Sequence, residues 1–264
     1  MIYYADENWS PLNDNPFSCD GHYDENWSAF IYDENVEYYT NIFEGAKVYT
    51  LRVSPKIDFK YERLLDFVCY EVGYKRNIII KVIATEKRYI KKIIDELQCD
   101  NSTIVRVTDP KWMVHSTTKE LWKSIEKTGS LLSPSELKKR NIIVSEIGLK
   151  SLMEPKDYSD YIMLDSLNGC GEIVVNSRQL GYVCVDADVP YNPGVRLYFD
   201  AHRIIEDGLA TRDGLHLLKV KKELPLERYL KSVVEKDLLE PKEVFTPTIF
   251  TEMSNNYFLD SVQL

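Results

Sequence analysis

Apolar and polar residues alternate with two different periods along the chain, and the changes of period mark the expected secondary structure. Alternation at every second position and runs of β-branched residues predict strands. Apolar positions spaced by three and four residues predict helices that bury one face. Strands are expected at residues 48–53, 78–84, 103–107, 112–114, 142–144, 161–164, 172–176, 181–185, 195–199 and 215–220, and within 243–250. Helices are expected at residues 61–72, 85–97, 118–128 and 226–234, with short helical turns after 133 and at 201–207.

The stretch from 111 to 132 has the clearest pattern, a short strand, a polar turn at residues 115–117 and a helix. Thr117 is suited to cap the helix with Glu120 three residues later, and Gly129 is suited to end it. His115 is expected beside the unpaired N–H groups of the helix start, which is a favourable place for a polar or anionic ligand. The alternative is a histidine that only satisfies the turn.

The length of 264 residues, with 44% hydrophobic and 28% charged residues, is enough for two modest globular domains. Asp109-Pro110 is a suitable boundary, because the residue before a proline is disfavoured in a helix. We therefore expect an N-terminal α/β module at residues 1–108 and a second domain at residues 109–264. The predicted fold class of the whole chain is α+β.

Near the N-terminus a short acidic and aromatic motif recurs at irregular spacing. It reads Tyr-Ala-Asp-Glu-Asn-Trp-Ser from Tyr4, Tyr-Asp-Glu-Asn-Trp-Ser from Tyr23 and, more weakly, Tyr-Asp-Glu-Asn from Tyr32. Aromatic residues with a polar rim are typical of interfaces, so this segment is a candidate docking surface for a protein partner. The alternative is a set of loops whose tryptophans and tyrosines pack inward.

Charge and cysteine content exclude several classes of protein. The net charge of −9 disfavours tight non-specific binding to nucleic acid, which needs Lys and Arg on the phosphates. No apolar run approaches the ~20 residues of a membrane span, and we expect no signal peptide and no membrane association. The odd number of cysteines, 5, and the lack of a CxxC pair predict a reducing cytoplasm, no disulfide framework and no zinc. Asp186 and Asp188 are expected to be solvated, not to bind a metal.

Motifs in the second half resemble those of the RNA 2′-phosphotransferase family, within the ADP-ribosyltransferase-like fold. Val114-His115-Ser116-Thr117, followed by Trp122, Ile125 and Gly129, resembles that family's "HGT" strand and "W..I...G" helix. The segments 161–166 and 176–181 are similar to its "VHLS" strand and "VG.R.G" segment. The segments 195–201, 207–220 and 224–230 follow its pattern from "vLvIDa" to "VP..yl". The resemblance covers residues 112–232.

The resemblance implies an ADP-ribosyltransferase-like domain with a split sheet, and cleavage of NAD⁺ at the bond between nicotinamide and ribose. His115 would bind the ribose next to nicotinamide, with Ser116 and Thr117 helping to position it. Arg178 and Arg212 would pair with phosphates of the cofactor or acceptor. A carboxylate would stabilise the oxocarbenium-like transition state, and the candidates are Glu172 and Glu243, between which the sequence does not choose.

The functional expectation is an NAD⁺-dependent transferase that acts on RNA or on a protein. Alternatives are an interaction protein that has lost catalysis on the same fold, and an ADP-ribosylating toxin or antiphage effector. Departures from the family pattern bear on this choice. Ser116 replaces the glycine of "HGT", Met163 replaces the histidine of "VHLS", and residues 1–108 contain no "LRH" signature. The loss of the second histidine favours loss of phosphotransfer.

Overall fold

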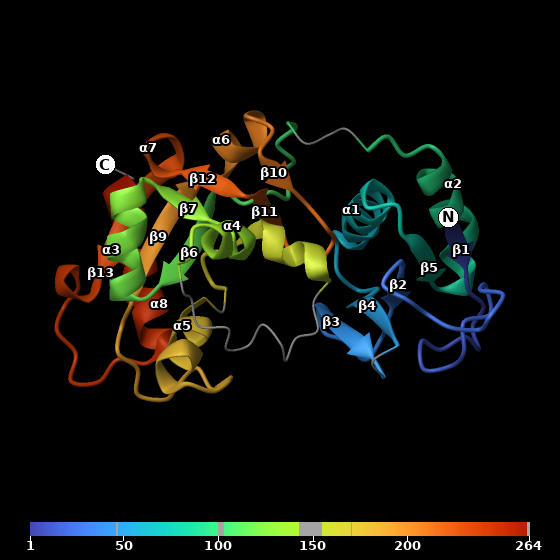
Figure 1. The fold of residues 1–264 in the computed structure, drawn as a ribbon, viewed down its shortest axis with the longest axis horizontal. Helices are drawn as coiled ribbons and strands as arrows, with labels where there is room; N and C mark the ends of the chain where they lie inside the picture. The colour runs from blue at the N-terminus through green and yellow to red at the C-terminus, as the bar shows by residue number, and fades with distance from the viewer. Residues whose placement is uncertain (46, 100–102, 143–154, 170, 263–264) are drawn as a thin grey trace. The chain divides into compact units, whose positions relative to one another are not determined.

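The computed structural model describes residues 1–45, 47–99, 103–142, 155–169 and 171–262 (Figure 1). The chain divides into two compact units. Unit 1 comprises Met1–Asn101, Ser151–Lys156 and Thr211–His216, and unit 2 comprises Ser102–Lys150, Asp157–Ala210 and Leu217–Leu264. Both combine helices with β-sheets, as the predicted mixed α and β class requires. Within the described ranges no helix is long and apolar enough to cross a bilayer.

Unit 1 is built on a five-stranded sheet in the order β1-β5-β2-β4-β3. Its elements are β1 (Ile2–Tyr4), β2 (Trp27–Tyr32), β3 (Tyr39–Glu44), β4 (Val48–Val53), helix α1 (Lys60–Gly73), β5 (Asn77–Lys81), the 3₁₀ turn η1 (Ala84–Glu86) and helix α2 (Lys87–Asp95). The first four strands in the spatial order run parallel, and β3 pairs with β4 in the antiparallel sense. A parallel sheet of this kind needs cover on both faces, because its strands are apolar on both sides.

The two faces of this sheet are covered in different ways. Side chains of α1 and α2, including Leu64, Phe67 and Ile90, pack on one face. The loops between β1 and β2 cover the other face and bury Trp9 and Trp27, which are 6% and 8% exposed. The tryptophans of the N-terminal repeat therefore pack inward and serve as core residues of unit 1.

A disulfide joins Cys69 of α1 to Cys99, which follows α2, with a Cα–Cα distance of 5.3 Å. The expectation that the cysteines form no disulfide framework is wrong at these two positions. The two cysteines are separated by 30 residues, a spacing that does not predict a disulfide. They come together because α1 and α2 pack on the same face of the sheet. Cys19 and Cys184 are free, and Cys170 lies outside the described residues.

A distant turn completes unit 1. The expected Asp-Gly turn is present, with Gly214 at φ +82°, where an added Cβ would lie 2.5 Å from the carbonyl oxygen of Arg63. The guanidinium of Arg63 is buried and donates to the carbonyls of Gly214 at 3.0 Å and Leu215 at 2.9 Å. The turn is therefore fixed to α1 by a residue that lies about 150 positions earlier in the chain.

Unit 2 contains small sheets in the orders β13-β9-β6, β10-β11-β8 and β12-β7. Its strands are β6 (Trp112–Thr117), β7 (Ser130–Leu132), β8 (Tyr161–Leu164), β9 (Val195–Asp200), β10 (Ala210–Thr211), β11 (Leu218–Lys221), β12 (Glu223–Pro225) and β13 (Leu230–Glu235). Its helices are α3 (Lys119–Thr128), α4 (Pro134–Lys139), η2 (Lys156–Asp160), α5 (Gly171–Leu180), α6 (Ala201–Glu206), α7 (Leu226–Tyr229), η3 (Lys236–Leu238) and α8 (Pro247–Val262).

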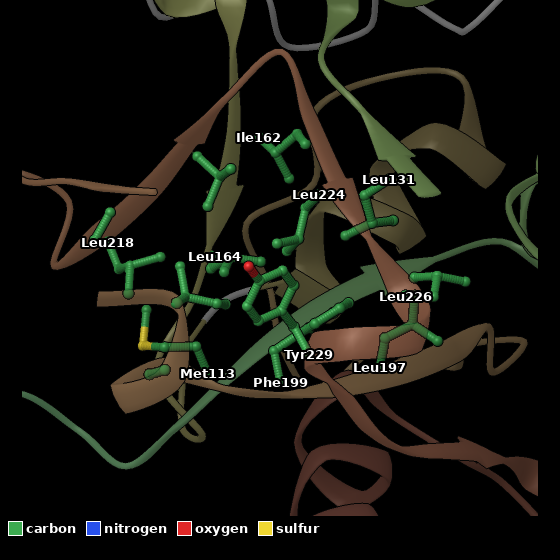
Figure 2. Close-up of a cluster of buried hydrophobic side chains, with 14 of the residues drawn as sticks. Met113, Leu131, Ile162, Leu164, Leu197, Phe199, Leu218, Leu224, Leu226 and Tyr229 are labelled. Carbon is green, nitrogen blue, oxygen red and sulfur yellow. The ribbon is translucent and has the colours of Figure 1, made fainter. Parts of the chain in front are cut away.

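These sheets share one hydrophobic core (Figure 2). Met113 of β6 and Phe199 of β9 meet Leu164 of β8, Leu218 of β11 and Leu224 of β12 in this cluster. All five side chains are 2% exposed or less. The sheets are too small to be stable alone, so the common core is what holds them as one unit.

Several local predictions in unit 2 are corrected by the structure. Strand β6 extends through Thr117, and the cap of α3 is Thr118, whose side chain accepts from the N–H of Leu121. Gly129 ends α3 at φ 69°, as predicted. Residues 226–234 form α7 and β13 instead of one helix, because β13 finds a partner in β9. Among the described residues, 103–107 and 181–185 form no strand.

Two expected strands are helices. Residues 172–176 lie in α5, where Glu172, Val175 and Asn176 are buried at helical spacing while Val174 is 43% exposed. The tail, where a strand was expected within 243–250, contains α8, which begins at Pro247 and continues to Val262. In both stretches packing decides between helix and strand, which short apolar runs leave open.

Candidate functional site

Strand β6 places the predicted triplet of His115, Ser116 and Thr117 on two different faces of its sheet. Successive side chains of a strand point to opposite sides. Ser116 is paired in register with Arg196, whereas His115 is paired with Leu197 and Thr117 with Val195. Leu197 and Val195 belong to the shared core. Ser116 therefore faces α5 and α8, and His115 and Thr117 face the opposite side.

On the Ser116 face lies a buried polar network centred on Glu172. The hydroxyl of Ser116 donates to Glu172 Oε1 at 2.5 Å, and Arg196 Nη1 donates to the same oxygen at 3.2 Å. The hydroxyl of Tyr191 donates to the other oxygen, Oε2. Glu172 and Arg196 are each 1% exposed. Gly171 permits this close packing, since a Cβ there would lie 2.8 Å from the Ser116 hydroxyl.

The rest of the Arg196 guanidinium is also paired. Nε donates to the hydroxyl of Tyr198 at 3.2 Å, and Nη2 donates to the carbonyl of Leu167. Tyr198 donates to Asn255 Oδ1 at 3.0 Å, and Asn255 Nδ2 donates back to the Leu167 carbonyl at 2.8 Å. Burial raises the pKa of Tyr198 to about 12. Burial and the neighbouring Glu172 carboxylate raise the pKa of Tyr191, so both phenols remain protonated donors. The network connects β6, α5, β9 and α8.

On the opposite face, His115 is a neutral imidazole. Its Nδ1 lies 3.4 Å from the carbonyl oxygen of Met163. Burial lowers the pKa of His115 to about 4; the Met163 carbonyl opposes this shift and the positive charge of Arg178 adds to it. With Nδ1–H directed at Met163, the remaining ring nitrogen, Nε2, is a hydrogen-bond acceptor. Met163 thus contacts His115 through its backbone carbonyl.

Arg178, in the last turn of α5, differs from Arg196 in having no partner among the residues that the structure describes. Within the described residues its guanidinium makes no hydrogen bond or ion pair, and its Nε is buried without an acceptor. Burial lowers the pKa of Arg178. Desolvating a cation without pairing it is unfavourable, so such a group is a candidate to receive an anion. The planar fork of a guanidinium fits phosphate and carboxylate oxygens.

The other predicted residues lie elsewhere. Thr117 is buried, at 1% exposed, next to the core. Arg212 belongs to unit 1, whereas His115, Glu172 and Arg178 belong to unit 2. Glu243 is exposed in the segment before α8. Of the two candidate carboxylates, Glu172 is the one beside Ser116. No group of three or more His, Cys, Asp or Glu in the described ranges could hold a metal.

Sequence reasoning did not identify the partners of Glu172. Arg196 and Tyr198 alternate with Val195, Leu197 and Phe199 along β9. An arginine inside such an apolar strand has to be paired if it is buried, and this is the signal that points to it. Tyr191 and Asn255 have no comparable signal, because only the tertiary structure brings Tyr191 to Glu172 and Asn255 to Arg196.

The chain matches no known protein family, no curated protein and no solved structure. Any functional assignment therefore depends on the residues of the site and on the motif resemblance.

Proposed function

We propose that unit 2 is an NAD⁺-dependent transferase of the ADP-ribosyltransferase type, with RNA or a protein as the acceptor. The observation that carries the proposal is the partly buried Arg178 guanidinium, which lacks a partner in the described chain and acts electrostatically on a neutral His115. The order of the motifs between residues 112 and 232 supports the same class.

In this proposal the two residues have complementary tasks. Arg178 binds a phosphate of NAD⁺ through paired N–H donors, and the bound anion offsets the cost of its desolvation. His115 accepts a hydrogen bond from a ribose hydroxyl through Nε2. A neutral imidazole is suited to this because it adds no positive charge next to a ribose that becomes cationic in the transition state.

The reaction is a substitution at the ribose carbon that bears nicotinamide. Nicotinamide leaves with the electron pair of the bond, the ribose passes through an oxocarbenium-like state, and an acceptor oxygen forms the new bond and loses its proton to solvent. Glu172 lies on the other face of β6 from His115, and its carboxylate is already paired with Ser116, Arg196 and Tyr191. In this proposal Glu172 therefore helps to fix strand β6, which carries His115, and does not contact the ribose.

A second candidate is a protein that binds a nucleotide without cleaving it, and serves as an interaction protein. The state of Glu172 favours it. One carboxylate oxygen accepts from Ser116 and Arg196, the other accepts from Tyr191, and the side chain is 1% exposed. A carboxylate so enclosed stabilises the fold and does not meet a substrate.

Calorimetric titration of NAD⁺ tests binding, and release of free nicotinamide tests cleavage. We expect saturable binding by the full chain and at least about tenfold weaker binding by Arg178→Gln and by His115→Gln. Arg140→Gln is the matched control, because this exposed arginine of unit 2 is paired with Glu223 at 3.1 Å. The control should bind NAD⁺ like the wild type.

The outcomes separate the two candidates. Binding with nicotinamide release supports the transferase. Binding without release, after incubation with RNA or protein acceptors, supports the nucleotide-binding protein. Absence of binding up to about millimolar NAD⁺, or equal binding by all variants, overturns both.

A further inference from the structure

Unit 1 has a pocket at the carboxyl ends of its parallel strands, separate from the residues discussed above. It has a volume of about 380 Å³, within the range of small-molecule sites. Its lining consists of Trp9, Ser10, Pro11, Ile31, Tyr32, Asp33, Glu34, Asn35, Arg52 and Lys81. In open sheets with parallel strands, ligands bind beyond the carboxyl ends of the strands.

The floor of the pocket is a row of three neighbouring residues on adjacent strands. Ile31 of β2 is in register with Lys81 of β5 on one side and with Arg52 of β4 on the other. Their side chains leave the sheet on the same face, the one covered by the N-terminal loops. The apolar Ile31 is thus flanked by two cations at the end of the sheet.

Two loops form fixed walls. On one side, the N–H groups of Asn8 and Trp9 donate to Asp6 Oδ1 at 3.1 and 3.0 Å, and the indole of Trp9 is buried in the core. On the other side, the N–H and side-chain amide of Asn35 donate to Asp33 Oδ1 at 2.9 and 3.0 Å. Walls that are already hydrogen-bonded need little ordering when a ligand binds.

Arg52 is paired with carboxylates, Asp33 among them, whereas two other charged side chains of the pocket, Lys81 and Glu34, form no ion pair in the described part of the chain. Arg52 pairs with Asp33 at 3.2 Å and with Glu44 at 2.6 Å. Lys81 donates to the carbonyl oxygen of Trp9 at 2.7 Å and has no carboxylate partner among the described residues. Glu34 makes neither a hydrogen bond nor an ion pair within the same ranges. One positive and one negative group therefore line the pocket without being paired to each other.

From this arrangement we infer that the pocket binds a zwitterionic small molecule of the amino-acid type. The ligand carboxylate pairs with the Lys81 ammonium, which has two N–H donors left after its bond to Trp9. The ligand ammonium pairs with the Glu34 carboxylate. A nucleotide fits less well, because the indole of Trp9 is packed in the core and the Tyr32 hydroxyl donates to the carbonyl of Lys60, so neither ring is free to stack on a base.

Calorimetry with the standard amino acids, each titrated singly into the full chain, tests this inference. We expect saturable binding of at least one amino acid. Its N-acetyl derivative, which lacks the ammonium, and its amide, which lacks the carboxylate, should each bind at least about tenfold more weakly. Inorganic phosphate should not compete.

Variants locate the site. Lys81→Met and Glu34→Gln should each weaken binding of the amino acid at least about tenfold. Lys87→Met is the control, because Lys87 also donates to a backbone carbonyl, that of Ala5 at 3.2 Å, but does not line the pocket. Its binding should equal that of the wild type.

The inference is overturned if no amino acid binds up to about 10 mM, or if both pocket variants bind like the wild type. It is also overturned if the N-acetyl derivative and the amide bind as well as the zwitterion. Should Lys81→Met fail to fold, Glu34→Gln decides, because Glu34 is exposed and its replacement leaves the sheet intact. Titration with NAD⁺ concerns unit 2 and has no bearing on this result.

Discussion

Unit 2 contains two arginines, Arg196 in β9 and Arg178 in α5, whose charges are compensated to different extents. Arg196 forms a buried ion pair with Glu172. Ser116 and Tyr191 donate further hydrogen bonds to the two carboxylate oxygens of Glu172. His115, on the other face of β6, is neutral. Arg178, in α5, has no hydrogen-bond or ion-pair partner among the described residues, and its positive charge contributes to the lowered pKa of His115. Arg196 is buried and Arg178 is partly buried, but among the described residues only Arg196 has a carboxylate partner that offsets the cost of desolvating its charge.

The presence or absence of a partner distinguishes a charged side chain that stabilises the fold from one that is available to bind a ligand. A fully paired buried ion pair holds elements together and leaves little capacity for another ligand. An unpaired, partly desolvated guanidinium weakens the fold and gains most from a bound anion. Replacing each group in turn should therefore have opposite consequences for stability and for binding.

The largest effect is expected from Arg196→Met. It leaves the Glu172 carboxylate buried without its cation, so the free energy of unfolding should fall by about 3–5 kcal/mol. Urea denaturation at pH 7 measures this change. The double variant Arg196→Met with Glu172→Leu should regain much of the lost free energy of unfolding, because it no longer buries an unpaired Glu172 carboxylate. A loss below about 1 kcal/mol in the single variant would contradict a structural role for the pair.

The next effect concerns the pH dependence that His115 introduces. Its pKa of about 4 in the folded chain lies below the ordinary value of 6.5, so the unfolded chain binds more protons between these values. The contribution of His115 to stability is therefore fully present above about pH 6.5 and is lost as the pH falls towards 4. Between pH 7.5 and 4.5 this amounts to about 2 kcal/mol.

Urea denaturation of His115→Gln at both pH values checks this expectation. The variant should lose about 2 kcal/mol less than the wild type on acidification. An identical pH dependence in wild type and His115→Gln would mean that His115 is not held neutral by burial.

The smallest change in stability is expected from Arg178→Met. Removing a guanidinium that has no partner within the described ranges should change the free energy of unfolding by less than about 0.5 kcal/mol, or should increase it. Thermal unfolding measures this change, and in these melts NAD⁺ should stabilise the wild type and leave Arg178→Met unaffected. Destabilisation by more than about 2 kcal/mol would show that Arg178 is a structural residue, as Arg196 is.

Much of the local structure follows from the amino-acid sequence alone. The strands at 48–53 and 161–164 match the structure, and the helix expected at 61–72 is α1. Gly129 ends its helix in the left-handed conformation, and the Asp-Gly turn is formed by Gly214 at positive φ. Apolar period, caps and glycine conformations act over a few residues, which is why the sequence is sufficient for them.

Tertiary structure decided the features that depend on distant partners. Residues 172–176 become a helix and residues 230–235 a strand because of what they pack against and pair with. Cys69 meets Cys99 only after α1 and α2 pack on one sheet face. The sequence predicted His115, Ser116 and Glu172 as candidates, but strand alternation and the burial of Arg196 determined which of them share a face. A side chain's partners are set by the whole chain, and so are its charge and its role.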